Sequence, residues 1–388
     1  MTGSRSVAVV LGTRPEVVKM SGIIRLLGDR ARVFHTGQHY DANLSDVFFT
    51  EAGLRAPDVQ FDLQPSAPGR AGQVAAMLNG LAEQFDRDRP AAVLVHGDTN
   101  STLAGALAAN GASIPLVHVE AGLRSFDRAM PEEHNRVATD HLADLLCAPT
   151  AVNVAQLARE RVAGLVVETG NTVVEATIAQ LPTPAERGPR LAARGLVARR
   201  YVLATLHRPE NTDDPDRLGA TLDALSRLPC PVIFPVHPRT RQAADRAGLA
   251  HLLERLATVE PLGPSDFLAL AADAALLVSD SGGVQEEATV LKRPLLVVRT
   301  STERPEALAE FAALVEPHEL LAAASRRLAD IDGTLDHLAR VRSPYGDGQA
   351  SRLVVEAVDD LIAGHERPTS PGRCTAARGA APAPFLVR

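Results

Sequence analysis

The sequence predicts an α/β protein with two doubly wound domains whose sheets face a central cleft. Short apolar runs alternate with amphipathic stretches along most of the chain, which is the pattern of repeated βαβ units with parallel strands. This alternation pauses between residues 181 and 200 and then resumes. The chain has 388 residues, whereas one domain typically contains roughly 100–200 residues. Two domains therefore account for the whole pattern.

The apolar runs are predicted to form the strands of the two sheets. Each run is nearly continuous and contains many β-branched residues, as expected for parallel strands that helices cover on both faces. Amphipathic segments at 71–85 and 99–109 are predicted to be helices between them. The predicted strands are 6–13, 31–37, 91–98, 114–121, 165–170, 201–207, 230–237, 257–262, 274–280 and 293–300.

The pause in the alternation divides the chain into its predicted parts. The N-terminal domain is expected at 1–170 and the C-terminal domain at 171–350, with the boundary near Gly170 or in the Pro-, Arg- and Ala-rich connector 181–200. Residues 351–365 are predicted to form a closing helix. The tail 366–388 consists largely of Pro, Ala, Arg and Gly, which predicts disorder.

Composition excludes several classes of partner. The formal net charge of −7 argues against nucleic acid as a main partner. The three cysteines, Cys147, Cys230 and Cys374, are too few and too scattered for a disulfide framework or a zinc site. No apolar segment reaches the roughly 18 residues that a membrane span needs, and the first apolar run lacks a cleavage pattern. We therefore expect a reduced, soluble, cytoplasmic protein without a metal or a membrane partner.

The motif "GTRPE" at 12–16 follows the first predicted strand. Gly12 allows a tight turn and Pro15 suits the first turn of a helix. Arg14 and Lys19 would flank that helix N-terminus, where cations and free N–H groups together favour an anion. A capped surface helix with solvated cations is the alternative. Neither a G-x-G-x-x-G nor a Walker A pattern is present, so neither NAD nor ATP is indicated and no cofactor is expected.

Three acidic residues follow strands or open helices in the first half. Asp98 and Glu120 each end a predicted strand beside a histidine, His96 and His118, and Glu132 opens the segment "PEEHNR". Carboxylates grouped in a cleft repel one another, which predicts a raised pKa for at least one of them and allows acid/base chemistry. The alternatives are an N-cap role for Asp98 and a helix-dipole role for Glu132.

The second half predicts an anion site. His207 with Arg208 and, separately, His237 follow strands, and this placement favours an anionic ligand. Ser281, Gly282 and Gly283 lie between a buried strand and a helix, where a hydroxyl and backbone N–H groups can surround a phosphate. The same "DSGG" letters surround the serine nucleophile of trypsin-like proteases. That alternative is rejected because those proteases are all-β, whereas Ser281 lies between a strand and a helix.

These motifs together resemble those of the non-hydrolysing UDP-N-acetylglucosamine 2-epimerases, relatives of the GT-B type glycosyltransferases that have two Rossmann-like domains. The resemblance extends from about residue 6 to residue 365. The segments that carry it are "GTRPEVVKM", "TGQHYD", "HGDTNST", "HVEAGLRS", "PEEHNR", "GNTVVEA", "HRPEN", "DSGGVQEEA", "TERPEA" and "PYGDGQAS".

The resemblance implies interconversion of UDP-GlcNAc and UDP-ManNAc through anti elimination of UDP, a 2-acetamidoglucal intermediate and syn re-addition. It also implies a homodimer. Asp98, Glu120 and Glu132 would be the acid/base carboxylates, in an order that stays open, and His207 would stabilise the departing diphosphate. The implied substrate-binding residues are Arg14, Lys19, Ser281, Gly282 and Gly283 at or beside the phosphates, Glu287 at the ribose and Phe267 near the uracil. Glu286 is expected to be structural.

The chain departs from the family pattern at three places. The segment Gln38-His39-Tyr40-Asp41 differs from the Gln-His-Arg-Gln-like segment of many bacterial members, and Pro209 stands where an arginine is frequent. Both differences argue against activation by a second substrate molecule. Pro264 replaces a usual tyrosine, which puts the uridine pocket in doubt. A hydrolysing 2-epimerase, a GT-B glycosyltransferase and a nucleotide-sugar binding protein stay open as rival functions.

Overall fold

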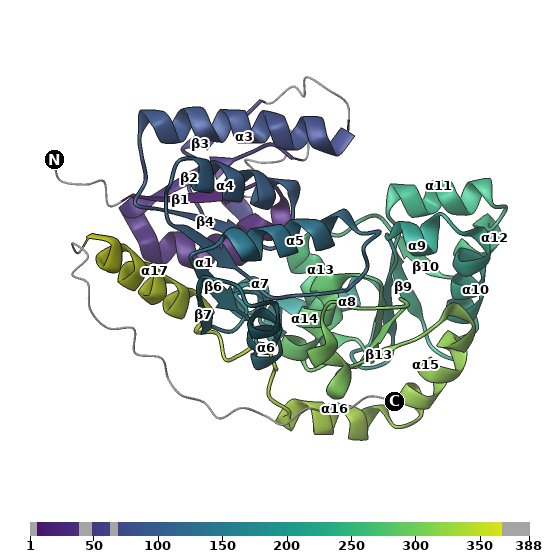
Figure 1. The fold of residues 1–388 in the computed structure, drawn as a ribbon. Coiled ribbons are helices and arrows are strands. Elements are labelled where there is room, and N and C mark those ends of the chain that lie inside the picture. The colour runs from purple at the N-terminus through teal and green to yellow at the C-terminus, as the bar shows by residue number, and fades with distance from the viewer. Residues whose placement is uncertain (1–5, 39–48, 63–68, 367–388) are drawn as a thin grey trace, which may run out of the picture.

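The computed structural model describes residues 6–38, 49–62 and 69–366. These residues form two parallel β-sheets with helices on both faces of each (Figure 1). The predicted fold class, two doubly wound α/β domains around a cleft, is therefore confirmed. Cys374, nearly all of the predicted tail and three of the four residues of "QHYD" (His39, Tyr40 and Asp41) lie outside the described residues.

The first sheet has the strand order β3-β2-β1-β4-β5-β6-β7. Its strands are β1 (Val7–Leu11), β2 (Ala31–His35), β3 (Val59–Gln60), β4 (Ala92–His96), β5 (Leu116–Val119), β6 (Leu145–Ala148) and β7 (Leu165–Glu168). The helices of this half are α1 (Arg14–Leu27), α3 (Gly69–Arg87), α4 (Asn100–Gly111), α5 (Pro131–Leu142), α6 (Ala151–Glu160) and α7 (Val173–Gln180), with a 3-10 turn at Gly28–Arg30.

The second sheet has the order β10-β9-β8-β11-β12-β13. Its strands are β8 (Val202–Thr205), β9 (Val232–Pro235), β10 (Ala257–Val259), β11 (Leu276–Ser279), β12 (Leu295–Val297) and β13 (Ala312–Leu314). Its helices are α8 (Pro184–Ala192), α9 (Pro209–Thr212), α10 (Pro215–Ser226), α11 (Pro238–Arg246), α12 (Ala250–Leu253), α13 (Pro264–Asp273), α14 (Gly282–Leu291), α15 (Leu320–Ala329) and α16 (Ile331–Arg340), with 3-10 turns at Pro305–Ala309 and Pro317–Glu319.

Each predicted strand is present, but three further strands were not predicted. β6 and β13 lack β-branched residues, and β3 has only two residues, so none of them stands out in the sequence. The connector contains no strand, as predicted, but it does contain α8. Thr183 and Glu186 begin that helix with a capping box.

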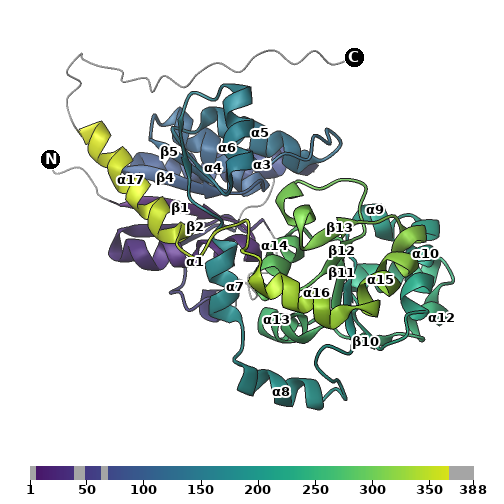
Figure 2. The ribbon, with the colours of Figure 1, turned by 90° about the horizontal axis from the view of Figure 1, so that it is seen from below.

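The closing helix, α17 (Ala350–Glu366), returns to the first sheet (Figure 2). It packs against α1, and its Val354 and Val358 are fully buried in the apolar cluster that contains Val7 and Val9 of β1. The chain therefore crosses between the two sheets twice. The exact domain boundaries at 170 and 350 stay predictions.

The two crossings meet each other. The backbone N–H of Asn171, after β7, donates to the carbonyl of Tyr345, before α17, at 2.8 Å. Gly170 has φ +80° and Gly346 has φ +104°, conformations that side-chain-bearing residues rarely adopt. A Cβ on Gly170 would lie 3.1 Å from the carbonyl oxygen of Tyr345. Glycine is therefore needed at positions 170 and 346 for the two crossing segments to approach each other this closely.

Among the described residues, no helix is long and apolar enough to cross a membrane. In the same residues, no group of three or more His, Cys, Asp and Glu side chains is arranged to hold a metal ion. Cys147 and Cys230 are free thiols, and Cys147, a residue of β6, is buried in the core.

Candidate active site

Two adjoining cavities lie between the sheets, at the carboxyl ends of the strands. Their volumes are about 440 Å³ and about 880 Å³. Asp98 from the first sheet and Ser281, Gly283 and Arg304 from the second half line both of them. All predicted site residues line one or the other: Arg14, Lys19, Asp98, Glu120, Phe267, Ser281, Gly283 and Glu287 in the smaller, and Glu132, His207 and Gly282 in the larger.

The N-terminus of α14 faces these cavities. Ser281 is the N-cap, and its side chain makes no capping hydrogen bond within the described residues. A Cβ on Gly283 would have the Ser281 hydroxyl at 3.8 Å as its nearest described neighbour, so the space above this turn is open. A Cβ on Gly282 would lie 2.6 Å from the Arg304 guanidinium. This open turn leaves space for the predicted anion, whose binding stays a prediction, and Gly282 also makes room for Arg304.

The N-terminus of α1 differs, because a carboxylate of the chain already caps it. The carboxylate of Glu16 already accepts the backbone N–H groups of Gly12 at 2.9 Å and of Thr13 at 2.8 Å. Arg14 lies on the cavity wall and pairs with Glu51 at 3.2 Å. Lys19 is buried against carboxylates. Glu16 therefore caps this helix from within the chain, whereas Arg14 and Lys19 both line the smaller cavity, and their contact with an anion stays a prediction.

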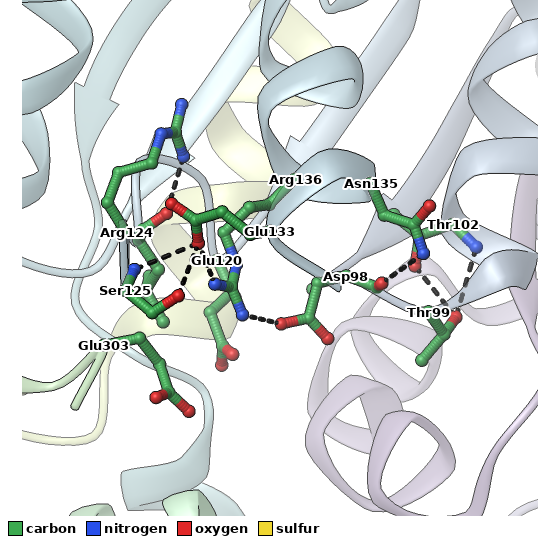
Figure 3. A network of polar contacts seen from close by, with 12 residues as sticks. Asp98, Thr99, Thr102, Glu120, Arg124, Ser125, Glu133, Asn135, Arg136 and Glu303 are labelled. Atoms are coloured by element: carbon green, nitrogen blue, oxygen red, sulfur yellow. Dashed lines mark hydrogen bonds and ion pairs between the residues drawn. The ribbon is translucent and has the colours of Figure 1, made fainter. Parts of the chain in front are cut away.

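Asp98 is held at the mouth of the first sheet by α5. Figure 3 shows the guanidinium of Arg136 between the carboxylates of Asp98 and Glu133, with which it forms ion pairs. The side-chain amide of Asn135 donates to the Asp98 carbonyl at 2.7 Å. The N-cap of α4 is Thr99, so the capping alternative for Asp98 is wrong. Its carboxylate is about one-third exposed and faces the cavities.

The neighbouring acids of "PEEHNR" have different environments. Glu132 lies in the first turn of α5, is exposed and lines the larger cavity, so its helix-dipole position is compatible with a role in that cavity. Glu133 is buried and accepts the backbone N–H groups of Ser125 at 3.0 Å and Phe126 at 2.9 Å. Together with its ion pair to Arg136, this anchors the loop after β5 and indirectly orients Asp98.

Glu120 is almost fully buried, with φ +68°, and is surrounded by donors. Its carboxylate lies 2.6 Å from the Lys19 ammonium, 3.4 Å from His96 Nε2 and 3.5 Å from the Arg304 guanidinium. Burial alone would raise the pKa of Glu120, but these charges outweigh burial and hold the pKa well below its ordinary value. The expected repulsion between clustered carboxylates is therefore wrong for Glu120, because cations separate it from the others.

Two histidines of the first sheet, His96 and His118, have different environments. His96 lines the smaller cavity beside Glu120. His118 is fully buried, with Nδ1 2.7 Å from Asp140 and Nε2 2.8 Å from the Gly97 carbonyl. Side chains of adjacent residues in a strand point to opposite faces of the sheet, so the packing around each histidine decides which of the two lines the cavity. His118 therefore does not line either cavity.

His207 lies half-exposed on the wall of the larger cavity, with Nδ1 2.9 Å from a carboxylate oxygen of the buried Asp280. Burial opposes ionisation of Asp280, but hydrogen bonds from His207, the Arg208 backbone and Asn211 outweigh it and lower the pKa of Asp280. An ionised carboxylate can only accept, so Nδ1 carries the proton and Nε2 is left for the cavity. His237 instead caps α11 through Arg239 N–H at 3.2 Å and does not line either cavity, contrary to expectation.

Several residues of the site were missed. The buried Glu303 accepts from Arg299 at 2.9 Å and pairs with Arg304 and, at 3.6 Å, with Arg208. Burial would raise the pKa of Glu303, but the three guanidinium groups hold it far below its ordinary value. Burial and the nearby Arg299 in turn lower the pKa of Arg208, which favours an additional anion there. Of this cluster, the sequence analysis named Arg208 beside His207, and the segment "TERPEA" contains Glu303 and Arg304.

The end of the smaller cavity that faces the second sheet is lined by Phe267 and Pro264 of α13 and by Glu287 of α14. Burial in this wall, together with the carboxylate of Glu286, raises the pKa of Glu287 to about 7. A carboxyl with a raised pKa therefore does exist in the cleft, but in the second domain. Glu286 is fully buried and does not line either cavity.

A model of the UDP-N-acetylglucosamine 2-epimerase family matches residues 28–359. The UDP-N-acetylglucosamine 2-epimerase of Methanococcus maripaludis is 36% identical over 93% of this chain and 99% of the relative. The UDP-2,3-diacetamido-2,3-dideoxy-D-glucuronate 2-epimerase of Pseudomonas aeruginosa is 36% identical over 92% of this chain and 99% of the relative. The crystal structure of Methanocaldococcus jannaschii UDP-GlcNAc 2-epimerase with UDP-GlcNAc and UDP has TM-score 0.80 and 35% identity, covering 92% of this chain and 99% of that one.

These matches span both sheets and the cleft between them, so they confirm the predicted resemblance in extent and in fold. The relatives' names specify two sugar nucleotides, UDP-N-acetylglucosamine and UDP-2,3-diacetamido-2,3-dideoxy-D-glucuronate, and the matches are compatible with both. Because the match covers nearly the whole chain at this identity, the chain belongs to the UDP-N-acetylglucosamine 2-epimerase family.

Proposed function

We propose that this chain is a non-hydrolysing UDP-N-acetylglucosamine 2-epimerase that interconverts UDP-GlcNAc and UDP-ManNAc. The observation that carries the proposal is the shared lining of the two cavities. Acidic side chains of the first sheet and the open N-terminus of α14 in the second half border the same space. Proton transfer at a sugar and departure of a diphosphate can therefore act on one bound substrate.

The reaction consists of an elimination and an addition. In the elimination a carboxylate takes the C2 proton, the C2–H electron pair forms the C1=C2 double bond, and the C1–O bond to the β-phosphate breaks. UDP and 2-acetamidoglucal then share the closed cleft. In the addition a β-phosphate oxygen bonds to C1, and C2 receives a proton on the opposite face. Atoms and electrons balance without a redox cofactor.

Each predicted residue has a place in this scheme. Asp98, Glu120 and Glu132 form the acid/base set, with Asp98 and Glu132 the members that face the larger cavity. His207, whose Nε2 is left free by Asp280, stabilises the charge that develops on the leaving diphosphate. Ser281 and the N-terminus of α14 bind the phosphates, with Arg14, Lys19, Gly282 and Gly283 at or beside them. Glu287 accepts the ribose hydroxyls, and Phe267 packs near the uracil.

Arg208 extends this set. Its lowered pKa reflects a guanidinium that is buried beside another guanidinium and is only loosely paired with Glu303. A diphosphate in the larger cavity would supply the missing negative charge. We therefore include Arg208 among the residues that bind the diphosphate.

Incubation of the protein with UDP-GlcNAc in D₂O tests the function. UDP-ManNAc that carries deuterium at C2 is the expected product. Free ManNAc with UDP would instead identify a hydrolysing epimerase, in which the glucal leaves and is hydrated. Absence of C2 exchange, with UDP-2,3-diacetamido-2,3-dideoxy-D-glucuronate as well, would contradict epimerisation. Exchange with that acid sugar alone would keep the reaction and change the substrate.

The proposed state in the cell is a cytoplasmic homodimer without a nucleic-acid or membrane partner. The family resemblance supports the dimer, and the two free thiols agree with a reducing compartment. Light scattering on the purified protein should give twice the mass of 41.1 kDa.

A further inference from the structure

Lys19, Glu120, Arg304 and Glu286 form a closed ring of ion pairs at the base of the cleft, which we call the ionic ring. Lys19 lies 2.6 Å from Glu120 and 2.8 Å from Glu286. Arg304 closes the ring, 2.7 Å from Glu286 and 3.5 Å from Glu120. Each cation therefore bridges the same two carboxylates, and all four side chains are at least nine-tenths buried.

The ionic ring joins the two halves of the molecule. Lys19 belongs to α1 and Glu120 follows β5, both of the first sheet, whereas Glu286 belongs to α14 and Arg304 follows β12, both of the second. Two of the four ion pairs in the ring, Lys19–Glu286 and Arg304–Glu120, cross the cleft. The contacts across the cleft can exist only while the two halves stay in this arrangement.

Asn171 links the ring to the point where the chain crosses between the halves. Its side-chain amide donates to Glu120 at 3.0 Å and to Glu286 at 3.1 Å. Its backbone N–H donates to Tyr345 of the second crossing. The residue that follows Gly170 at the crossing thus touches one carboxylate from each half.

A buried ring of this kind is not needed for stability alone. Removing four charges from water is expensive, and well-packed apolar residues at such places are frequently at least as stable. What the ring supplies is geometry, because Glu120 has its carboxylate oriented by donors from three directions. Lys19 and Arg304 pair with both Glu286 and Glu120, so Glu286 limits how strongly these two cations bind Glu120.

We propose that Glu286 is a positioning residue: through Lys19 and Arg304 it holds the Glu120 carboxylate in its working orientation when the two halves are closed. Glu286 itself does not line either cavity, so it acts without touching substrate. The setting of Glu120 is then a consequence of the closure that brings α14 against the first sheet. This inference rests on the proposed function, since it assigns a role within that reaction.

The test is a double-mutant cycle on kcat between Glu286→Gln and Lys19→Met. Glu286→Gln keeps the shape and removes the charge, so both cations fall on Glu120, and kcat should drop by about 10- to 100-fold. UDP affinity should stay within about twofold of wild type, because Glu286 lies outside the cavities. The loss in the double variant should be clearly smaller than the product of the two single losses, since Glu286 acts in part through Lys19.

Glu160→Gln provides the matched control. Glu160 is also paired with an arginine, Arg124, at 2.8 Å, but on α6 and away from both cavities. It should lower the thermal midpoint without lowering kcat. Should Glu286→Gln fail to fold, Asn171→Asp places a carboxylate between Glu120 and Glu286 and should produce the same kcat loss.

Three results would overturn the proposal. One is a kcat within about twofold of wild type for Glu286→Gln, and another is a double variant whose loss is the product of the single losses. The third does not depend on activity: small-angle scattering should show Glu286→Gln more open than wild type, and superimposable profiles would contradict the ring's role in closure. Failure of the proposed function is seen separately, as absence of C2 exchange in the wild type.

Discussion

At the scale of single residues, the three acidic groups of the first sheet are set apart by their partners. Asp98 is oriented by Arg136, Glu120 by the ionic ring, and Glu132 projects from the first turn of α5 into the larger cavity. Carboxylates in such different environments can perform different steps at one pH, because their surroundings and not their chemistry distinguish them.

Asp98→Asn and Glu132→Gln are each expected to lower kcat by about 100-fold or more, since each removes a proton-transfer group while preserving shape. UDP affinity should change little, because the proposed uridine and phosphate contacts lie on α13 and α14. Steady-state kinetics and titration calorimetry with UDP measure both. Near-normal turnover by either variant would remove that residue from the acid/base set.

Glu287 predicts a pH dependence of UDP binding. With its pKa raised to about 7, the carboxyl is largely protonated in the free protein below that pH. Ribose hydroxyls donate hydrogen bonds to the ionised form, so binding favours loss of the proton and strengthens as pH rises toward 7. The ratio of wild-type to Glu287→Gln affinity should grow by up to about tenfold per pH unit between about pH 5 and 7, then level off.

Comparison of the two proteins cancels the titration of the nucleotide's own phosphate. A ratio that stays constant from pH 5 to pH 8 would show that Glu287 does not accept the ribose hydroxyls.

At the scale of elements, α1 and α14 are two helices that begin after a strand at the cleft but use their N-termini differently. Glu16 fills the N-terminus of α1 from within the chain, whereas that of α14 is left open beside Ser281. An open N-terminus at a cavity is available to an anionic ligand, and a filled one contributes only to stability.

The glycines of α14 should respond unequally to substitution. Gly282→Ala forces a Cβ to within 2.6 Å of the Arg304 guanidinium and should destabilise the unliganded protein by about 1–3 kcal/mol. Gly283→Ala meets ordinary contact distances and should leave the unliganded midpoint nearly unchanged. Thermal unfolding without nucleotide compares them, and equal midpoints would mean that Arg304 moves aside freely.

Capping offers a second comparison between elements. Glu16→Gln should destabilise the protein by about 1–2 kcal/mol, because a buried carboxylate that accepts two backbone N–H groups is lost. Glu186→Gln removes the equivalent residue of the exposed capping box of α8 and should have a smaller effect. Denaturant titrations measure both, and a larger loss for Glu186→Gln would contradict the assignment of Glu16 as an internal anion.

At the scale of the whole molecule, the last helix secures the first half. α17 crosses back from the second sheet and buries Val354 and Val358 beside β1 (Figure 2). Val354→Ala should destabilise the protein by about 2 kcal/mol. Val152→Ala, at a side chain that is half exposed on α6, serves as the control and should have little effect. Equal unfolding midpoints would show that α17 is not part of the core.

The sequence by itself determined the fold class, the positions of most strands and many of the cavity-lining residues. Apolar β-branched runs can form little else than covered parallel strands, and polar residues that end such strands must meet at one sheet edge. Strands without that signature, such as Leu145–Ala148, escaped prediction because tertiary packing alone makes them strands.

The tertiary structure alone decided which polar groups face ligand and which face each other. Glu16 and Arg14 are neighbours in one motif, yet one fills a helix N-terminus and the other lies on a cavity wall. Glu120, Glu286 and Arg304 lie far apart in the chain and meet only because two sheets close on one another. Long-range ion pairing leaves no local pattern, which is why the ionic ring could not be predicted from the residues around each member.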